Sequence, residues 1–150
     1  MQKGKDYIGV GVGAIICNDQ HQLLLCKRGS LARNERGCWE CPGGSVEFGE
    51  TMVAAVKREM QEELGVTIRI IKQLNAIDHL IPGDRQHWVT SGFIVQIIGS
   101  NEPKIMEPGK CDEIGWFALD NLPAPLSIAT QHSIVSYQEF LKNSEKTHSY

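Results

Sequence analysis

One segment near the middle of this 150-residue chain restricts its fold more than any other. From Thr51 to Leu64 apolar side chains recur every three or four residues, which predicts a helix with one buried stripe. The stripe consists of Val53, Val56, Met60 and Leu64. Thr51 is a typical N-cap residue, and Gly65 is typical of the left-handed position after a helix. The sequence therefore predicts an amphipathic helix with chemically marked ends.

Short apolar runs on both sides of this segment predict strands. They cover residues 9–17, 23–26, 66–74, 88–98 and 114–119. We interpret the first two runs as a hairpin, and residues 29–37, 82–84 and 107–110 as loops or turns. A second helix is expected at 126–141, followed by a polar, loose tail at 143–150. The expected fold is one α/β (α+β) domain over 1–150, with its core at about 7–142 and helices packed on a mixed sheet.

Charge and hydropathy exclude several classes of protein. The net charge of −3 and the pI near 5.9 argue against binding to duplex nucleic acid. The apolar runs are far shorter than a membrane span, and the N-terminus does not resemble a signal peptide, so we expect a cytoplasmic protein. The five cysteines are an odd number, and disulfides are not expected. Cys38 and Cys41 form a CxxC motif without a second ligand pair, which does not favour a zinc or redox site.

The predicted helix at 51–64 also carries an acidic flank. Glu59 and Glu63 lie one helical turn apart, and Glu62 lies beside them, so three carboxylates share about a third of the helix circumference. Arg58 pairs with Glu62 at the i, i+4 spacing and neutralises only part of this charge. A solvated acidic face is the ordinary interpretation of such a cluster. The alternative is a site for a cation.

The residues before the helix favour the second interpretation. Gly43 and Gly44 allow the backbone to approach a ligand closely, and Glu47 and Glu50 follow before the helix begins. The complete spacing is Gly44, five residues, Glu50, seven residues, Arg58-Glu59-Met60, one residue, Glu62-Glu63, one residue, Gly65-Val66. This pattern resembles the signature of the Nudix hydrolases.

The resemblance extends over most of the chain, from about residue 7 to residue 142. The segment Gly37-x-Trp39-x-x-Pro42-Gly-Gly is similar to the one that precedes the signature, and Ile114-Gly-Trp-Phe117 is similar to the closing strand. Three further segments are similar to the MutT-related branch, which hydrolyses nucleoside triphosphates. They are residues 9–13, 87–90 and 107–111. The resemblance implies a Nudix-type α/β/α sandwich with a central mixed sheet.

The resemblance also implies a mechanism that depends on a metal. Glu59 and Glu63 are the expected principal ligands of Mg²⁺, with Mn²⁺ as a substitute, and Glu62 and the carbonyl of Gly43 are expected to contribute. Glu59 or Glu62 is expected to orient or deprotonate the attacking water. Arg58 is expected to hold the carboxylates in place. Glu50 is expected to support them or to bind metal as well.

Four side chains are candidates for binding substrate. Arg28 and Arg33 suit phosphate or base, and His87 and Trp88 suit base stacking, although each residue type more often serves structure alone. The expected reaction converts a nucleoside triphosphate, including modified ones, to the monophosphate and pyrophosphate. Alternatives are the hydrolysis of ADP-ribose or a nucleotide sugar, and a non-catalytic nucleotide-sensing module. The expected partner is a small nucleotide, and a homodimer is compatible with the resemblance.

Overall fold

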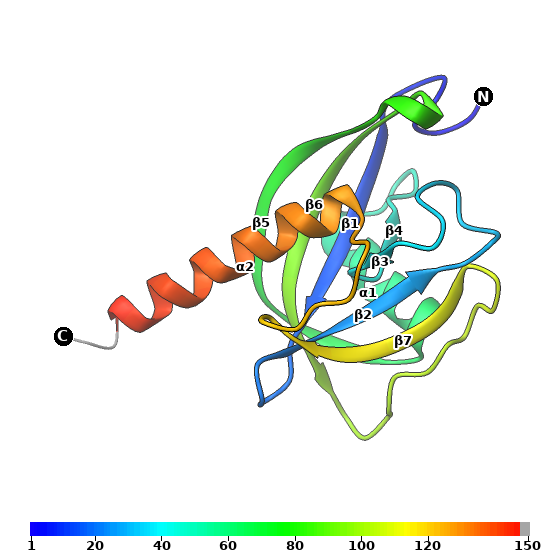
Figure 1. The fold of residues 1–150 in the computed structure, drawn as a ribbon. Coiled ribbons are helices and arrows are strands. Elements are labelled where there is room, and N and C mark those ends of the chain that lie inside the picture. Colours follow the sequence, from blue (N-terminus) through cyan, green and yellow to red (C-terminus); the bar gives the residue numbers. More distant parts are fainter. Residues whose placement is uncertain (148–150) are drawn as a thin grey trace.

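The computed structural model describes residues 1–147 and contains two sheets and two long helices (Figure 1). The N-terminal half comprises β1 (Gly9–Ile16), β2 (Gln22–Arg28), β3 (Trp39–Glu40), β4 (Gly43–Ser45) and α1 (Met52–Leu64). The C-terminal half comprises β5 (Thr67–Ile81), the short 3-10 helix η1 (Pro82–Asp84), β6 (Gln86–Ile98), β7 (Cys111–Ala118) and α2 (Ile128–Thr147).

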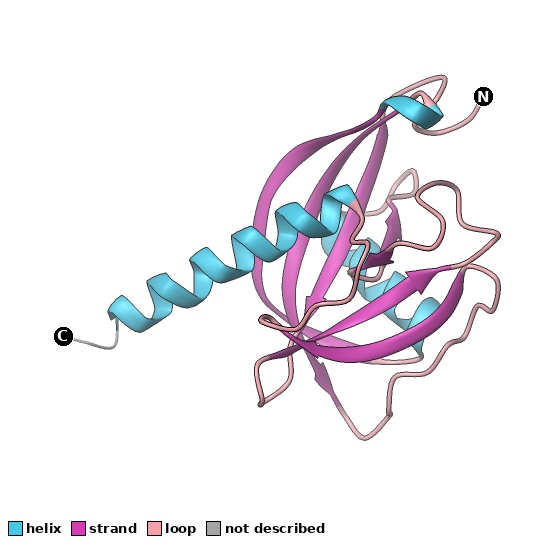
Figure 2. Ribbon diagram, viewed as in Figure 1, coloured by secondary structure: helices cyan, strands magenta, loops and turns pink. Residues whose placement is uncertain are grey.

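The strands divide between a mixed sheet and an antiparallel sheet (Figure 2). The mixed sheet has the order β4-β1-β6-β5, with β1 and β6 parallel and the other neighbours antiparallel. The second sheet has the order β3-β2-β7. Helix α1 lies behind the strands in this view, and α2 crosses in front of them. The expected α/β fold with helices on both faces is confirmed, although its strands form two sheets instead of one central sheet.

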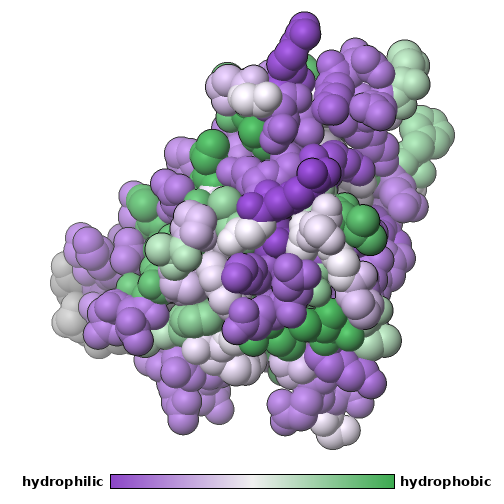
Figure 3. Space-filling view, turned by 45° about the vertical axis from the view of Figure 1, so that its right-hand side comes forward, coloured by the Kyte–Doolittle hydropathy of each residue, from purple (hydrophilic) through white to green (hydrophobic). Residues whose placement is uncertain are grey.

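Two apolar clusters hold these layers together. The first joins the buried face of α1, including Val56 and Met60, to Phe93 of β6. The second joins Ile134 and Tyr137 of α2 to residues of β1, β2, β3 and β6. Alternate residues of each strand enter opposite clusters because side chains alternate across a strand. Most of the face in Figure 3 is polar, and its apolar residues form separate patches.

Helix α1 has the ends that its sequence predicts. The hydroxyl of Thr51 accepts a hydrogen bond from the backbone N–H of Ala54 at 3.1 Å. Gly65 adopts the left-handed conformation, with φ of 67°, and its N–H bonds back to the helix. Val56, Met60 and Leu64 of the predicted stripe are buried and turn that side of α1 toward the core, whereas Val53, the first residue of the predicted stripe, is exposed.

The predicted hairpin of the first two strands is wrong. β1 and β2 belong to different sheets, and one isolated bridge, between Cys17 and Leu23, joins the chain around them. Both strands have buried residues on both faces, so each is covered by other elements on either side. The turn at 18–22 therefore carries the chain from one sheet to the other.

Two further boundaries differ from expectation. Strand β5 continues to Ile81, seven residues past the predicted end at Leu74, because it pairs with β6 along nearly its whole length. Helix α2 continues to Thr147, so the first part of the expected loose tail is helical, and residues 148–150 lie outside the described residues. Neither helix, within residues 1–147, is long and apolar enough to span a membrane.

Candidate active site

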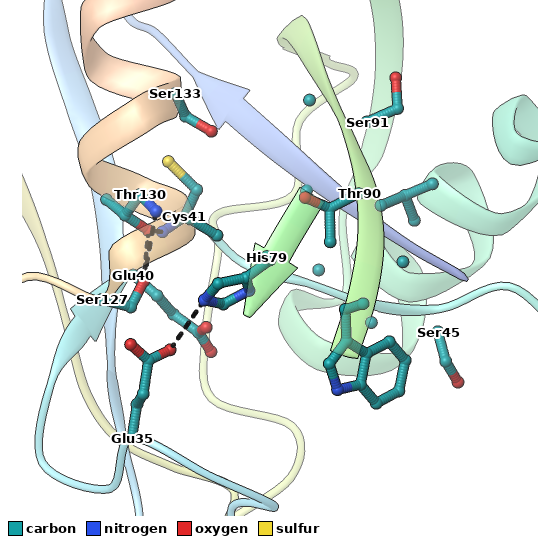
Figure 4. A pocket seen from close by; sticks show the side chains of 18 of the residues that line it. Glu35, Glu40, Cys41, Ser45, His79, Thr90, Ser91, Ser127, Thr130 and Ser133 are labelled. Atoms are coloured by element: carbon teal, nitrogen blue, oxygen red, sulfur yellow. Dashed lines mark hydrogen bonds and ion pairs between the residues drawn. The ribbon is translucent and has the colours of Figure 1, made fainter. Parts of the chain in front are cut away.

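A cavity of about 360 Å³ opens between the two sheets (Figure 4). Its walls come from β1, β4, α1, β5, β6, the loop at 29–37 and the first turns of α2. Glu59 and Glu63 of α1 enter it beside Gly43 and Gly44 of β4. The fold therefore turns two carboxylates of the acidic flank, those of Glu59 and Glu63, into this cavity.

Arg58 binds three of the carboxylates around α1. Its guanidinium donates to both carboxylate oxygens of Glu50, at 3.0 and 2.6 Å. It also donates to Glu59 at 3.0 Å and to Glu62 at 3.1 Å, and to the carbonyl of Ser45 at 3.0 Å. The pKa of Glu50 falls to about 2, chiefly because of these bonds from Arg58. Arg58 thus orients the carboxylates and does not itself line the cavity.

Glu59 lies against the backbone of Gly44. A Cβ atom at position 44 would lie 2.2 Å from Oε1 of Glu59, far inside van der Waals contact. Burial raises the pKa of Glu59, although the ion pair with Arg58 opposes that shift. The glycine therefore permits a largely buried carboxylate to lie flat on strand β4.

Glu63 lies at the most acidic part of the cavity. Its carboxylate accepts a hydrogen bond from the backbone N–H of Gly43. Burial raises the pKa of Glu63 well above its usual range, and the nearby carboxylates of Glu40, Glu59 and Glu107 raise it further. Such a group favours a nearby cation, because each carboxylate opposes the ionisation of the others.

The donor chemistry of this group fits a divalent metal ion. Carboxylate oxygens are hard ligands that suit Mg²⁺, and buried like charges are unfavourable without a counter-ion. Across residues 1–147, no three His, Cys, Asp or Glu side chains are already gathered at the spacing of a metal site. Instead, Arg58 holds Glu59 and Glu62, and the N–H of Gly43 binds Glu63. The ligand roles of these residues remain predictions.

Arg28, a predicted substrate contact, lines the cavity but is bound within the protein. Its guanidinium donates to Glu40 at 2.6 Å, and to the backbone carbonyl and the side chain of Asn34 at 2.7 and 2.9 Å. Burial raises the pKa of Glu40, and Arg28 opposes that shift. Arg28 therefore links Asn34, within the loop at 29–37, to Glu40 of β3.

The other three predicted substrate contacts separate into two locations. The guanidinium of Arg33 lies 4.8 Å from the centre of the Trp88 ring, and both residues line the cavity. His87 does not line it and instead pairs with Asp78 at 3.1 Å. Adjacent residues of a strand point to opposite faces, so His87 and Trp88 do not reach one ligand together. The structure thus does not bring His87 to the candidate site.

Several cavity residues were not predicted from the sequence. They are Glu35, Glu40, His79 and Lys110. Lys110 donates to Glu107 at 3.0 Å, and the pair lies close enough to Glu59 and Glu63 to influence their ionisation. The strong charge of the 107–110 turn was the available signal for Lys110. No sequence signal pointed to His79, because the strand predicted at 66–74 ended before it.

The CxxC motif is a poor candidate for chemistry. Cys41 is buried, and its backbone N–H donates to the hydroxyl of Thr130 at 2.8 Å. Burial raises the pKa of its thiol to about 12, which keeps the thiol protonated. Cys41 therefore packs as a small apolar residue where α2 begins.

Comparison with known proteins places this fold and site in context. The family model described as NUDIX domain matches residues 8–138. An ADP-ribose pyrophosphatase from Methanocaldococcus jannaschii is 37% identical over 114 residues, which cover 76% of this chain and 64% of that protein. An 8-oxo-dGTP diphosphatase from Proteus vulgaris is 37% identical over 95 residues, covering 63% of this chain and 80% of that protein. The chain thus spans slightly less than two-thirds of the first relative.

Solved structures show the same architecture. A MutT NUDIX hydrolase from Burkholderia pseudomallei has a TM-score of 0.78 and 39% identity, covering 86% of this chain and 97% of that chain. The NUDIX domain of Shewanella oneidensis NrtR, complexed with ADP ribose, has a TM-score of 0.74 and 23% identity, covering 91% and 90% of the two chains. Because its identity is only 23%, the similarity to the Shewanella oneidensis domain supports the fold alone.

Proposed function

Because the chain belongs to the Nudix hydrolases, we propose that it converts a nucleoside triphosphate to the monophosphate and pyrophosphate with the help of Mg²⁺ or Mn²⁺. The observation that carries this proposal is the acidic group of α1, turned into a cavity together with Gly43 and Gly44. The group suits a reaction at a polyanion, because it can recruit the cations that a phosphate chain requires.

In the proposed site, Glu59 and Glu63 hold the metal, with Glu62 and the Gly43 carbonyl as further ligands. When bound, the metal neutralises phosphate charge and stabilises the charge that develops in hydrolysis. Glu59 lines the cavity, whereas the Glu62 side chain is 51% exposed and bound to Arg58. Glu59 is therefore the better placed of the two candidates to orient the attacking water.

The remaining roles belong to residues that support this centre. Arg58 and Glu50 keep the carboxylates aligned, because their bonds link the loop before α1 to its second turn. Lys110 lines the cavity near Glu59 and Glu63, and its ammonium suits a phosphate oxygen. Arg33 and Trp88 suit the base. A small nucleotide is thus the proposed partner.

Two other functions remain alternatives. One relative is named an ADP-ribose pyrophosphatase, which favours ADP-ribose or a nucleotide sugar as the second candidate substrate. A module that senses nucleotides without hydrolysis is the third, and the complete acidic set argues against it. The three functions differ in their products.

The test is a substrate panel with product chromatography, run with Mg²⁺ and with a chelator. Nucleoside triphosphates are expected to yield pyrophosphate and the monophosphate in the presence of Mg²⁺ only. AMP and a sugar phosphate from ADP-ribose, without turnover of any triphosphate, would favour the second candidate. Binding without any turnover would favour the third.

A further inference from the structure

One buried side chain in the cavity has a hydrogen-bonding atom without a partner. His79 is 7% exposed, and its Nε2 makes no hydrogen bond. A buried polar atom in this state is costly and uncommon, because folding removes it from water without replacing the lost bond. The imidazole lines the cavity, and in Figure 4 a dashed line joins it to Glu35, so that Nε2 faces this carboxylate.

The carboxylate of Glu35 faces this nitrogen. Oε2 of Glu35 lies 3.6 Å from Nε2 of His79, too far for a hydrogen bond. Oε1 of the same carboxylate accepts the backbone N–H of Ile128 at 3.0 Å, which fixes Glu35 at the start of α2. The cavity thus contains an imidazole nitrogen and a carboxylate oxygen side by side, held by separate elements.

The pairing of β5 and β6 places a flat platform beside these two groups. His79 lies directly opposite Trp88 in the strand register, so their side chains share one face of the sheet. Gly4 and Gly9 leave the space that the Trp88 ring occupies, since a Cβ at either position would lie within 2.6 Å of a ring atom. The guanidinium of Arg33 lies over the same ring.

Gln86 fixes the orientation of this platform. Its Oε1 accepts hydrogen bonds from Nε1 of Trp88 and from Nδ2 of Asn34, both at 2.8 Å. These two bonds attach the tryptophan ring to the loop at 29–37, which also carries Arg33 and Glu35. The platform and the carboxylate are therefore held in a fixed relation before any ligand binds.

We infer that His79 and Glu35 form a donor–acceptor pair that binds the edge of the nucleobase, while the Arg33 guanidinium, supported by the buried Trp88 ring, provides the surface on which the base stacks. This inference rests on the proposed function, which places the phosphates at α1. A nucleobase presents an N–H donor next to an acceptor on its pairing edge, and its ring is flat. Both properties match this part of the cavity.

The ionisation of His79 agrees with such a role. Burial lowers the pKa of His79, although the Glu35 carboxylate opposes that shift. A neutral imidazole has one N–H, and the neighbouring carboxylate favours its location on Nε2. In the free protein this N–H faces Glu35. In the inferred pair Nε2 donates to the acceptor of the base instead, and Glu35 accepts from the N–H of the base next to it.

The same two strands contain a matched control pair on their other face. Asp78 and His87 lie 3.1 Å apart, and the Asp78 side chain is 76% exposed. Asp78→Asn removes a carboxylate beside a histidine, as Glu35→Gln does, but outside the cavity. Two substitutions at His79 separate the role of its N–H from that of its ring. His79→Gln retains an N–H donor, and His79→Phe retains only an aromatic ring.

The experiment measures the binding of α,β-methylene triphosphates of adenosine, guanosine, cytidine and uridine by calorimetry with Mg²⁺. The unmodified protein and Asp78→Asn are expected to prefer the same base by about tenfold or more. Glu35→Gln and His79→Phe are expected to lose that preference, and His79→Gln to retain most of it. Thermal melting identifies any variant that does not fold. If a His79 variant does not fold, the comparison of Glu35→Gln with Asp78→Asn tests the inference.

An equal loss of binding for all four bases in the variants, or an unchanged order of preference, would overturn the inference. So would an unmodified protein that binds all four analogues equally. Hydrolysis of the ordinary triphosphates is assayed separately. A base preference without hydrolysis would overturn the proposed function but not the inferred recognition of the base by His79 and Glu35. Failure of the proposed function and failure of this inference are therefore distinguishable.

Discussion

Gly44 leaves the room that the Glu59 carboxylate occupies on strand β4. We expect Gly44→Ala to reduce turnover by about 100-fold, because the added methyl would displace the carboxylate of Glu59, which we propose to be catalytic, by roughly 1 Å. It should also reduce the free energy of unfolding by about 1–3 kcal/mol through overpacking. Steady-state kinetics and urea unfolding measure both effects.

Gly83 provides the control for this substitution. It lies in η1, and a Cβ atom there would meet nothing within 4 Å. Gly83→Ala should therefore leave turnover unchanged. Normal turnover by Gly44→Ala would show that the close contact between Glu59 and the strand has no role in positioning the carboxylate.

The ion pair of Glu50 with Arg58 predicts a pH dependence of stability. The folded-state pKa of Glu50 is about 2, below its ordinary value near 4.5, so the pair stabilises the fold above pH 4.5. That stabilisation is lost as the pH falls from 4.5 toward 2, because the unfolded chain binds the proton first. In Glu50→Gln the free energy of unfolding should fall less steeply over this range.

Urea unfolding at successive pH values, with a chelator present, measures this slope. Glu139→Gln on α2 is the matched control, since Glu139 is exposed and outside the cavity. It should retain the slope of the unmodified protein. A slope in Glu50→Gln equal to that of the control would contradict the assigned ion pair.

Helix α1 depends on its N-cap as well as on its buried stripe. Thr51→Ala should lower the free energy of unfolding by about 1 kcal/mol, because the N–H of Ala54 loses its acceptor. Thr51→Ser keeps the hydroxyl and should lose little. Urea unfolding compares the two variants, and equal stability of Thr51→Ala and the unmodified protein would show that the cap contributes nothing.

The elements differ in how far the sequence predicted them. Helix α1 was predicted to within a residue, because its caps and its periodicity are local properties. The pairing of β1 with β2 was predicted wrongly, because partner choice depends on packing between distant segments. β2 in fact pairs with β7, whose residues lie some 90 positions away in the sequence.

In the candidate site too, local helix geometry was predictable from the sequence, and contacts between distant segments were not. Helical geometry alone placed Glu59 and Glu63 on one flank, and the structure turns that flank into the cavity. His79 was not predicted, because its position opposite Trp88 is a matter of strand register. Glu35 and Lys110 lie outside the helices and main strands, and their positions depend on tertiary contacts.

At the scale of the whole molecule, the two sheets and α2 form the other walls of the cavity that Glu59 and Glu63 of α1 line. Apolar clusters on either side of the strands hold α1 and α2 in place, and the cavity lies where the sheets separate. In the proposed function, the carboxylates of Glu59 and Glu63, the phosphates and the base would share this one cavity. The proposed catalysis thus depends on a cation bound by the carboxylates of α1.

The most direct test is the Mg²⁺-dependent turnover of a nucleoside triphosphate by Glu59→Gln and Glu63→Gln, with Glu139→Gln as control. Turnover should fall by about three orders of magnitude or more in the first two variants and remain normal in the control. Circular dichroism should show that all three proteins are folded. Undiminished turnover by both Glu59→Gln and Glu63→Gln would contradict the account.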